Sequence, residues 1–428
     1  AASDVYKRQV SAEQIQSAIA AVEAREGLDD ETRARVIDQL RDAQAQLQNR
    51  QSSQTAAAAF TKSLQTAPAE TEKLRQQLNK EAPPAPTTDS LGIDETTPLT
   101  DLEQALATKL AEVAATEARL AELESQESTQ AERPAKARER INELRSGMDA
   151  ISASIESAPP PGELAIVTDA RKLAAEVKLD ARNAELNRLD QEIVSNNVRL
   201  ELTRAQRDMA ARTLASLRRE VELLQAGVNA KRQISATQAL QETALAELAA
   251  ADKHPVVRQL AEGNAELTRE LPAVAADIER VTDELSTIEE QARSIEQDLA
   301  RSRQRLEVGG VTQAIGRLFV EERRNLPQVS QYRAEVRARR QALSQIGLAQ
   351  VRIEEQRRDL TALEDRVEAA MAEVREDAAD DDDLQSIQGE VEELLRNRRD
   401  LLVQVAATYT SYIRALGDLD VAQRRLLD

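Results

Sequence analysis

The sequence contains one histidine, His254, the side chain best suited to proton transfer near neutral pH. General-base catalysis would require a partner within hydrogen-bond reach in a formed pocket. The neighbours of His254 are Lys253 and Pro255, which indicate an exposed junction between two helices. We therefore expect a structural role for His254 at that junction.

A run of four aspartates, Asp380 to Asp383, offers the oxygen ligands that hard cations prefer. The run lacks the spacing, the glycine and the distal glutamate of a calcium-binding loop. Asp is also a preferred residue at the start of a helix, where its charge favours the positive end of the helix dipole. We therefore expect one Asp to cap a helix that begins near Leu384, and we predict no metal site.

The segment Gly309-Gly310-Val311-Thr312 precedes a predicted helix, as a phosphate-binding loop does. It lacks the following Lys-Ser/Thr pair and a preceding strand, so we interpret it as a turn. Carboxylate pairs occur throughout the chain, and no pairing of a nucleophile with a base stands out. We therefore assign no catalytic, cofactor-binding or metal-binding residue, and we predict that the protein is not an enzyme.

The composition favours long helices over a thick globular core. Hydrophobic residues make up 41% of the chain, yet it has only two Phe, four Tyr and no Trp, so Ala, Leu, Val and Ile supply most of the apolar surface. Charged residues make up 31%, as solvated helix faces require. The net charge is −19, with no basic patch interleaved with aromatics, so we expect no nucleic-acid partner. The absence of cysteine excludes disulfides and thiolate metal sites.

The longest uninterrupted helical pattern runs from Glu163 to Ala251. Two stripes that repeat every seven residues share one face, which is typical of a coiled-coil seam. The first is Leu186, Ile193, Leu200, Arg207, Leu214, Val221 and Val228, and the second is Leu189, Asn196, Thr203, Ala210, Leu217 and Leu224. A straight helix of this length would span about 130 Å, and it cannot bury its seam against itself.

Three polar residues, Asn196, Thr203 and Arg207, interrupt this seam. Polar seam residues can fix the register of a coiled coil at some loss of stability. They can equally mark the level at which a partner helix has ended and water enters. The residues themselves leave both alternatives open.

A second heptad pattern begins after His254-Pro255 and continues to Leu306. Its register continues across Pro272, so we expect a kink at that proline and no new helix. The two patterns predict a long antiparallel coiled-coil hairpin over 163–307. The second arm is the shorter one, so the first arm needs another partner along part of its length.

The other segments also read as helix. We predict an all-α fold in which long antiparallel coiled-coil hairpins form an elongated helical bundle. The predicted segments outside the long hairpin are a region of short helices over 1–80 (11–26, 30–65 and 69–80), a Pro-rich linker over 81–99, a helical hairpin over 100–158 that turns near 125–133, and a C-terminal helical region over 311–428 (311–325, 328–378 and 384 to the end).

Several stretches resemble the periplasmic N-terminal region of the large MscS-type mechanosensitive channels, the potassium-dependent and miniconductance kinds of Gram-negative bacteria. The residues that interrupt the heptads carry this resemblance best, namely His-Pro, Gly-Gly-Val-Thr-Gln-Ala, Asn-Leu-Pro and Ala-Leu-Gly-Asp-Leu. The similar stretches are AAAAFTKSLQTAPAETEKLRQQL (56–78), DARKLAAEVKLDARNAELNRLDQEIVSNNVRLELTRAQRDMAARTL (169–214), HPVVRQLAEGNAELTRELPAV (254–274), RLEVGGVTQAIGRLFVEERRNLP (305–327) and YTSYIRALGDLDVAQRRLL (409–427).

The resemblance implies a structural and mechanical module on the periplasmic face of the inner membrane, within a channel that protects the cell against hypo-osmotic shock. It further implies a homo-heptamer, contacts with the cell envelope, and membrane helices downstream of this chain, so no pore residue can be assigned here. The alternative is a free-standing coiled-coil scaffold or spacer of the cell envelope.

The ends of the sequence bear on this interpretation. The sequence does not begin with Met, and Ala1 to Gln9 match no later pattern, so we expect a fragment whose true start is missing. No signal peptide is visible in it, and no apolar run of about 18 residues is present.

Overall fold

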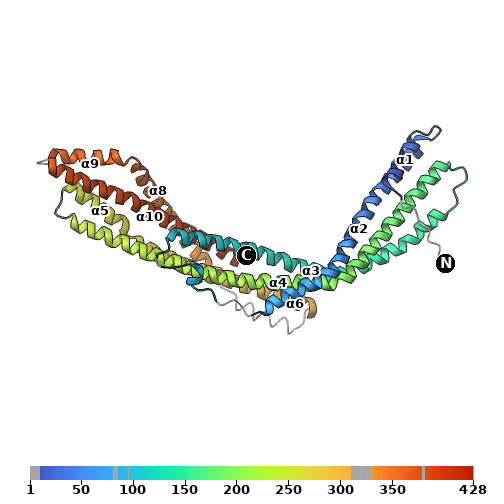
Figure 1. Cartoon of the computed structure of the whole chain (residues 1–428), viewed down its shortest axis with the longest axis horizontal. Helices are drawn as coiled ribbons and strands as arrows, with labels where there is room; N and C mark the ends of the chain where they lie inside the picture. Colours follow the sequence, from blue (N-terminus) through green and yellow to red (C-terminus); the bar gives the residue numbers. More distant parts are fainter. Residues whose placement is uncertain are drawn as a thin grey trace. The chain divides into compact units, whose positions relative to one another are not determined.

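The computed structural model describes residues 10–80, 85–94, 96–309, 320, 329–377 and 381–427. Within these ranges the regular elements are helices and there is no strand, which confirms the predicted all-α class (Figure 1). The elements are α1 (Ala12–Glu23), α2 (Asp30–Asn79), the short 3₁₀ helix η1 (Asp89–Leu91), α3 (Leu99–Glu156), α4 (Ala165–Ala249), α5 (Pro255–Arg269), α6 (Leu271–Gly309), α8 (Val329–Asp359), α9 (Leu363–Asp377) and α10 (Asp381–Leu427). No helix in the described ranges combines the length and the apolar character needed to cross a membrane.

The chain forms two units, which we describe separately. Unit 1 comprises Ala1–Thr87 and Ala107–Glu222, and unit 2 comprises Thr88–Leu106 and Leu223–Asp428. Helix α4 is continuous over its 85 residues and passes Gly227 without a break, as the long heptad pattern predicted.

Unit 1 begins with α1, whose start is a capping box. The Ser11 hydroxyl accepts the N–H of Gln14 at 3.3 Å, and the Gln14 side chain accepts the N–H of Ser11 at 2.9 Å. Past the end of α1, Gly27 adopts a left-handed backbone with φ of 88°, which favours glycine over any other residue. The chain then reverses, and α1 packs on α2 and the start of α4. The fully buried residues of this cluster are Ile15, Val22, Val36, Leu40 and Val177.

Helices α2 and α3 pack along the part of α4 that belongs to unit 1, in opposite directions. Thr61 of α2 contacts Gln191, and Arg75 further along α2 contacts Glu201 further along α4, so these two helices are parallel. Contacts of α3 run the other way, from Arg140 with Glu185 to Arg218 with Glu117. The long helix therefore obtains its additional partners from both α2 and α3.

Two predicted helix breaks in unit 1 are absent. Helix α2 continues through Pro68 to Asn79, so the separate helices predicted over 30–65 and 69–80 are one element. Helix α3 continues through Pro134, so the predicted hairpin over 100–158 is a single helix of 58 residues. A proline inside a helix costs about 3 kcal/mol. Both helices stay packed before and after the proline, because Ala67 and Thr71 in α2 and Leu123 and Ala137 in α3 are buried.

In unit 2 the last part of α4 pairs with α5 and α6 in the antiparallel sense predicted for these two arms. The hydroxyls of Thr243 and Thr268 lie 2.6 Å apart. The Asn229 amide donates to the Thr282 hydroxyl at 3.1 Å. Residue numbers fall along α4 from 243 to 229 while they rise from 268 to 282 on the partner, so the two arms are antiparallel.

The expected kink at Pro272 is a break between two helices, because α5 ends at Arg269 and α6 begins at Leu271. Pro272 is then the second residue of α6, a position at which a missing N–H removes no helical hydrogen bond.

Helix α10 is the centre of unit 2 and packs on α5, α6, α8 and α9. It contributes to two apolar clusters, one shared with α4, α5, α6, α8 and α9, and the other shared with α6 and α8. Its most deeply buried apolar residues are Val391, Leu402, Val405 and Leu419.

Two further boundaries differ from the sequence prediction. The helix predicted over 328–378 is interrupted at 360–362, which separates α8 from α9, although no glycine or proline marks the position. Leu360 in this turn is buried in the core of unit 2, so tertiary packing holds the break. Helix α10 begins at Asp381, before the predicted start near Leu384. The helix predicted over 311–325 lies outside the described residues.

The described part of the predicted linker ends in a turn that leads into α3. Gly92 has a left-handed backbone, and the carboxylate of Asp94 organises the residues that follow. It accepts the N–H and the hydroxyl of Thr96 at 2.8 and 2.7 Å, and the hydroxyl of Thr97 at 2.9 Å. These hydrogen bonds, the Thr96 hydroxyl first, lower the pKa of Asp94 from its ordinary 3.8 to about 2.

We predict that the Asp94 carboxyl titrates near pH 2 in the folded chain. Because its folded pKa is depressed, the ionised carboxylate makes its full contribution to the stability of the folded chain above about pH 4. This contribution is lost as the pH falls toward 2. Carboxyl-detected NMR measures the midpoint, and the Thr96 amide should follow the same titration. The variant Asp94→Asn should remove both transitions. A midpoint close to 3.8 would show that the turn does not hold the carboxylate as described.

We also predict that unit 2 depends on the inner face of α10. Leu402 is fully buried, whereas the adjacent Val403 is 50% exposed. Leu402→Ala should reduce the free energy of unfolding by about 2–5 kcal/mol, because it removes buried methyl groups and leaves a cavity. Val403→Ala is the matched control and should change it by less than about 0.5 kcal/mol. Urea denaturation followed by circular dichroism measures both, and equal losses would contradict the arrangement.

Candidate functional site

Two of the polar residues that interrupt the α4 seam, Thr203 and Arg207, meet polar partners on α3 in unit 1, whereas the buried side-chain oxygen of Asn196 has no hydrogen-bond partner among the described residues. The Thr203 hydroxyl donates to the Gln130 side-chain oxygen at 3.1 Å. The Arg207 guanidinium donates to the Glu127 carboxylate at 2.6 Å. Helix α3 continues alongside α4 at this level, so the end of a partner helix does not explain these residues. Thr203 and Arg207 match the alternative in which polar seam residues fix the register.

Glu192 is the most buried charge of this region, with 6% of its side chain exposed. Arg133 of α3 donates to both of its carboxylate oxygens, at 2.6 and 2.9 Å, and Arg188 donates from one turn earlier on α4 at 3.3 Å. The bond to Glu192 raises the pKa of Arg133. A bidentate guanidinium–carboxylate pair is among the most directional contacts in proteins. We name 127–133 of α3 and 188–207 of α4 together the polar layer.

The polar layer explains why the apolar pattern of α3 lapses over 125–133, where the sequence predicted a turn. Glu127, Gln130 and Arg133 are three residues apart, so they share one helix face. That face lies on the polar stretch of α4, and each side supplies hydrogen-bond partners for the other. The loss of the apolar pattern therefore marks the part of one continuous helix that packs on polar residues of α4. The sequence signal for this site was the presence of polar seam residues in α4 together with a stretch of α3 that lacks apolar residues at the expected positions.

Arg212 of α4 holds the end of α2. Its guanidinium donates to the backbone oxygens of Gln77 at 3.0 Å, Leu78 at 2.8 Å and Lys80 at 3.1 Å. The last carbonyls of a helix have no partner within the helix, and α2 has no basic residue in its own last turn. A side chain from α4 thus caps α2 and fixes its position along the helix axis.

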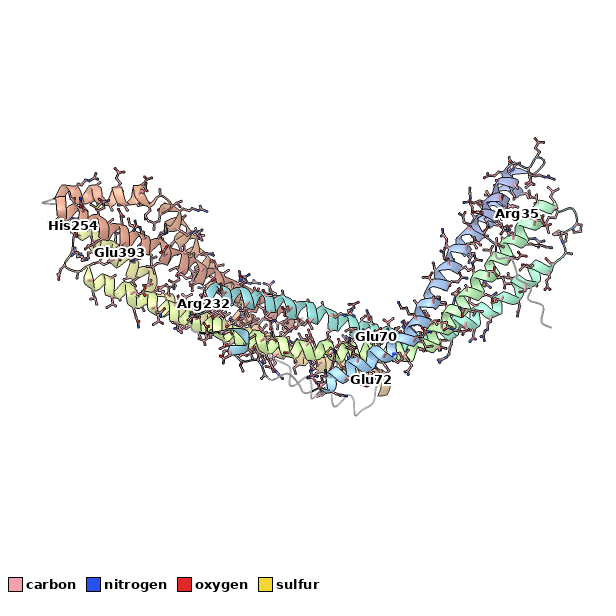
Figure 2. The ribbon with its side chains drawn as sticks, in the orientation of Figure 1. Arg35, Glu70, Glu72, Arg232, His254 and Glu393 are labelled. Carbon is pink, nitrogen blue, oxygen red and sulfur yellow. The ribbon has the colours of Figure 1, made fainter. Side chains whose placement is uncertain are left out.

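His254 lies at the junction between α4 and α5, as predicted (Figure 2). It is the N-cap residue of α5, and its Nδ1 accepts the N–H of Val256 at 3.3 Å while Pro255 occupies the first helical position. The side chain is partly buried rather than exposed, and its Nε2 has no partner among the described residues.

The two remaining motifs lie at helix ends. Asp381 to Asp383 lie in the first turn of α10, and Asp380 lies outside the described residues. Gly309 is the last residue of α6, and the rest of the predicted turn, Gly310 to Thr312, lies outside the described residues.

Comparison with known families assigns more than half of the chain to a known domain. Residues 18–259 match the model of the mechanosensitive ion channel porin domain, which is the periplasmic porin region of large MscS-type channels. The chain belongs to this family. The MscS porin domain therefore includes α2, α3, the whole of α4 and the polar layer. Comparisons with curated proteins and with solved structures found no match.

Family membership confirms the resemblance drawn from the sequence. The chain is a module of an MscS-type mechanosensitive channel, and channels of this family are homo-oligomeric membrane proteins. The word porin in the domain's name does not correspond to strands in the described residues, which form an all-α MscS porin domain.

We predict that removing the Glu192 charge destabilises unit 1. Glu192→Gln keeps the shape but leaves Arg133 and Arg188 without their carboxylate, so the free energy of unfolding should fall by about 1–3 kcal/mol. The control is Glu143→Gln, which removes an ion pair of α3 whose carboxylate is 58% exposed, and it should cost less than about 0.5 kcal/mol. Urea denaturation of both variants measures the difference. Equal stability would mean that the polar layer contributes no more than a surface pair.

Proposed function

We propose that this chain is the non-enzymatic periplasmic module of a mechanosensitive channel that protects the cell against hypo-osmotic shock. The observation that supports this most directly is the match of 18–259 to the porin domain of MscS-type channels. The module lies on the periplasmic face of the inner membrane. Membrane helices downstream of this chain form the pore, and the subunits assemble as a homo-heptamer with contacts to the cell envelope.

The work of the module in this proposal is mechanical. Ion pairs between α3 and α4 recur from Arg140–Glu185 through Arg133–Glu192 to Arg218–Glu117. Sliding α3 by one helical turn, about 5.4 Å, would carry each guanidinium out of reach of its carboxylate. Such an array resists shear along the helix axes, which suits a rigid spacer between subunits or toward the envelope.

The experiment that tests this proposal removes residues 10–428 from the full-length channel and keeps its export signal and membrane region. We expect a shifted tension threshold in patch recordings, impaired assembly of the subunits, or both, together with reduced survival after osmotic downshock. The physical reason is that the deletion removes the rigid helices that set the spacing of the subunits. Single-channel conductance is the control, because the pore itself is unchanged.

An unchanged threshold, unchanged assembly and unchanged survival would together refute the mechanical role. A reading frame that ends near Asp428 in the source gene, with an isolated chain that forms a stable parallel oligomer, would instead support a free-standing coiled-coil scaffold of the envelope.

A further inference from the structure

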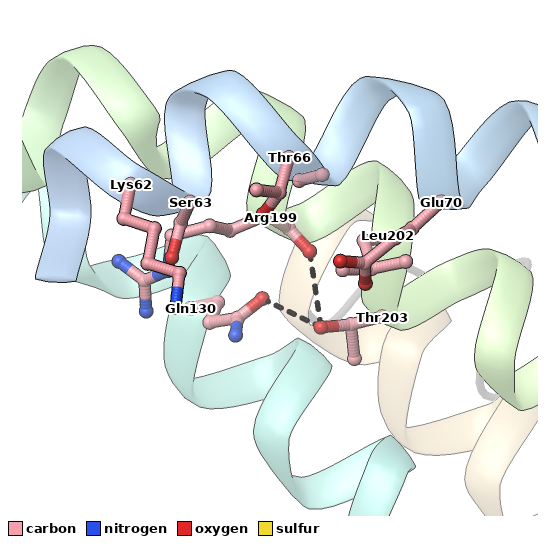
Figure 3. A pocket seen from close by; sticks show the side chains of 9 residues that line it. Lys62, Ser63, Thr66, Glu70, Gln130, Arg199, Leu202 and Thr203 are labelled. Atoms are coloured by element: carbon pink, nitrogen blue, oxygen red, sulfur yellow. Dashed lines mark hydrogen bonds between the residues drawn. The ribbon is translucent and has the colours of Figure 1, made fainter.

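Unit 1 contains a pocket that the mechanical role does not use. It has a volume of about 320 Å³, far more than the roughly 30 Å³ share of one water. Three helices form its walls, with Lys62, Thr66 and Glu70 from α2, Gln130 from α3, and Arg199 and Thr203 from α4 (Figure 3). We name it the Arg199 pocket.

Arg199 differs from two other arginines of the polar layer on α4 because it has no ion pair among the described residues. Arg188 and Arg207 of the same helix each contact a carboxylate. The Arg199 guanidinium instead lies over the Phe60 ring, with its Cζ 4.6 Å from the ring centroid. Its Nη1 is shielded from solvent and has no hydrogen-bond partner among the described residues. Burial is the main cause that lowers the pKa of Arg199, repulsion by Arg133 adds to it, and the nearby charge of Glu192 opposes it.

Further donors line the pocket beside this guanidinium. In the described part of the chain, neither a hydrogen bond nor an ion pair reaches the Lys62 ammonium group, although it shares the pocket with Arg199. The Thr203 hydroxyl lies 3.1 Å from both the Gln130 side-chain oxygen and the Arg199 backbone oxygen, and no described residue accepts from the amide N–H groups of Gln130. A guanidinium, an ammonium group and an amide are the donors that oxyanion sites use.

No carboxylate of the described residues forms an ion pair with these donors. Glu192 is already engaged by Arg133 and Arg188. Glu70 lines the pocket from an exposed position, and Figure 3 shows it beside Leu202 and Thr203, at the opposite end from the Lys62 and Arg199 side chains.

We propose that the Arg199 pocket binds a small free oxyanion of the phosphate or sulfate class. The guanidinium of Arg199 supplies the principal contact, and Lys62 and Gln130 supply the others. The observations that support this site do not rest on the mechanical role proposed above. Because α2, α3 and α4 all contribute to its walls, a bound oxyanion stabilises their association, and this stabilisation grows with the logarithm of the oxyanion concentration once the site is saturated.

The test is titration calorimetry of the full 428-residue chain with inorganic phosphate and with sulfate, at constant ionic strength maintained by chloride. We expect saturable binding of either oxyanion and a rise of the melting temperature with its concentration. Arg199→Gln should weaken binding about tenfold or more, because it removes a charge-assisted donor. Arg204→Gln is the matched control, an arginine of the same helix that pairs with Glu127 outside the pocket, and it should leave affinity unchanged.

Lys62→Gln provides a second variant on the exposed side of α2 that does not disturb the core, and it should also weaken binding. Absence of saturable phosphate and sulfate binding by the unmodified chain overturns the proposal, whatever the variants do. Equal affinity in Arg199→Gln and Arg204→Gln, with both variants folded by circular dichroism, overturns it as well.

Discussion

A helix of 85 residues cannot bury an apolar seam against itself, and the rest of this chain is arranged to supply partners for α4. In unit 1 the partners are α2, which runs parallel to it, and α3, which runs antiparallel. In unit 2 the partners are α5 and α6, joined to α4 by the short junction at His254. Because each partner must follow a long seam, the partners are long as well, and few residues remain for loops.

The polar layer imposes a second constraint on these helices. Burying Glu192 with Arg133 gains little net stability, because desolvation offsets much of the attraction between the charges. Displacing one partner is different, since a buried charge would then have no counter-charge. The layer therefore penalises wrong registers more than it stabilises the correct one. An apolar heptad seam alone allows a partner to shift by seven residues at little cost, and charges at fixed positions exclude that shift.

Helix boundaries that depend on neighbouring residues in the sequence could be predicted, and those that depend on packing against another helix could not. The heptads of α4, the cap at Ser11 and the turn at Gly27 follow from residue types at short spacing. The continuity of α2 through Pro68 and of α3 through Pro134 depends on burial against another helix, which a single segment does not reveal. The break at 360–362 likewise follows from the burial of Leu360. Of the site, Asn196, Thr203 and Arg207 were visible in the sequence, whereas the partners of Thr203 and Arg207 were hidden in a stretch that looked like a turn.

The Arg199 pocket lies within the same stretch of α4 as the polar layer, and this position relates the proposed ligand to the mechanics. A ligand shifts a conformational equilibrium only by its difference in affinity between the two states. The donors of the pocket come from α2, α3 and α4, so any axial displacement of one helix separates them. An oxyanion bound there can consequently favour only the aligned arrangement. The stiffness of unit 1 would then depend on the concentration of that ion as well as on the sequence, in a module whose charged contacts already fix the register.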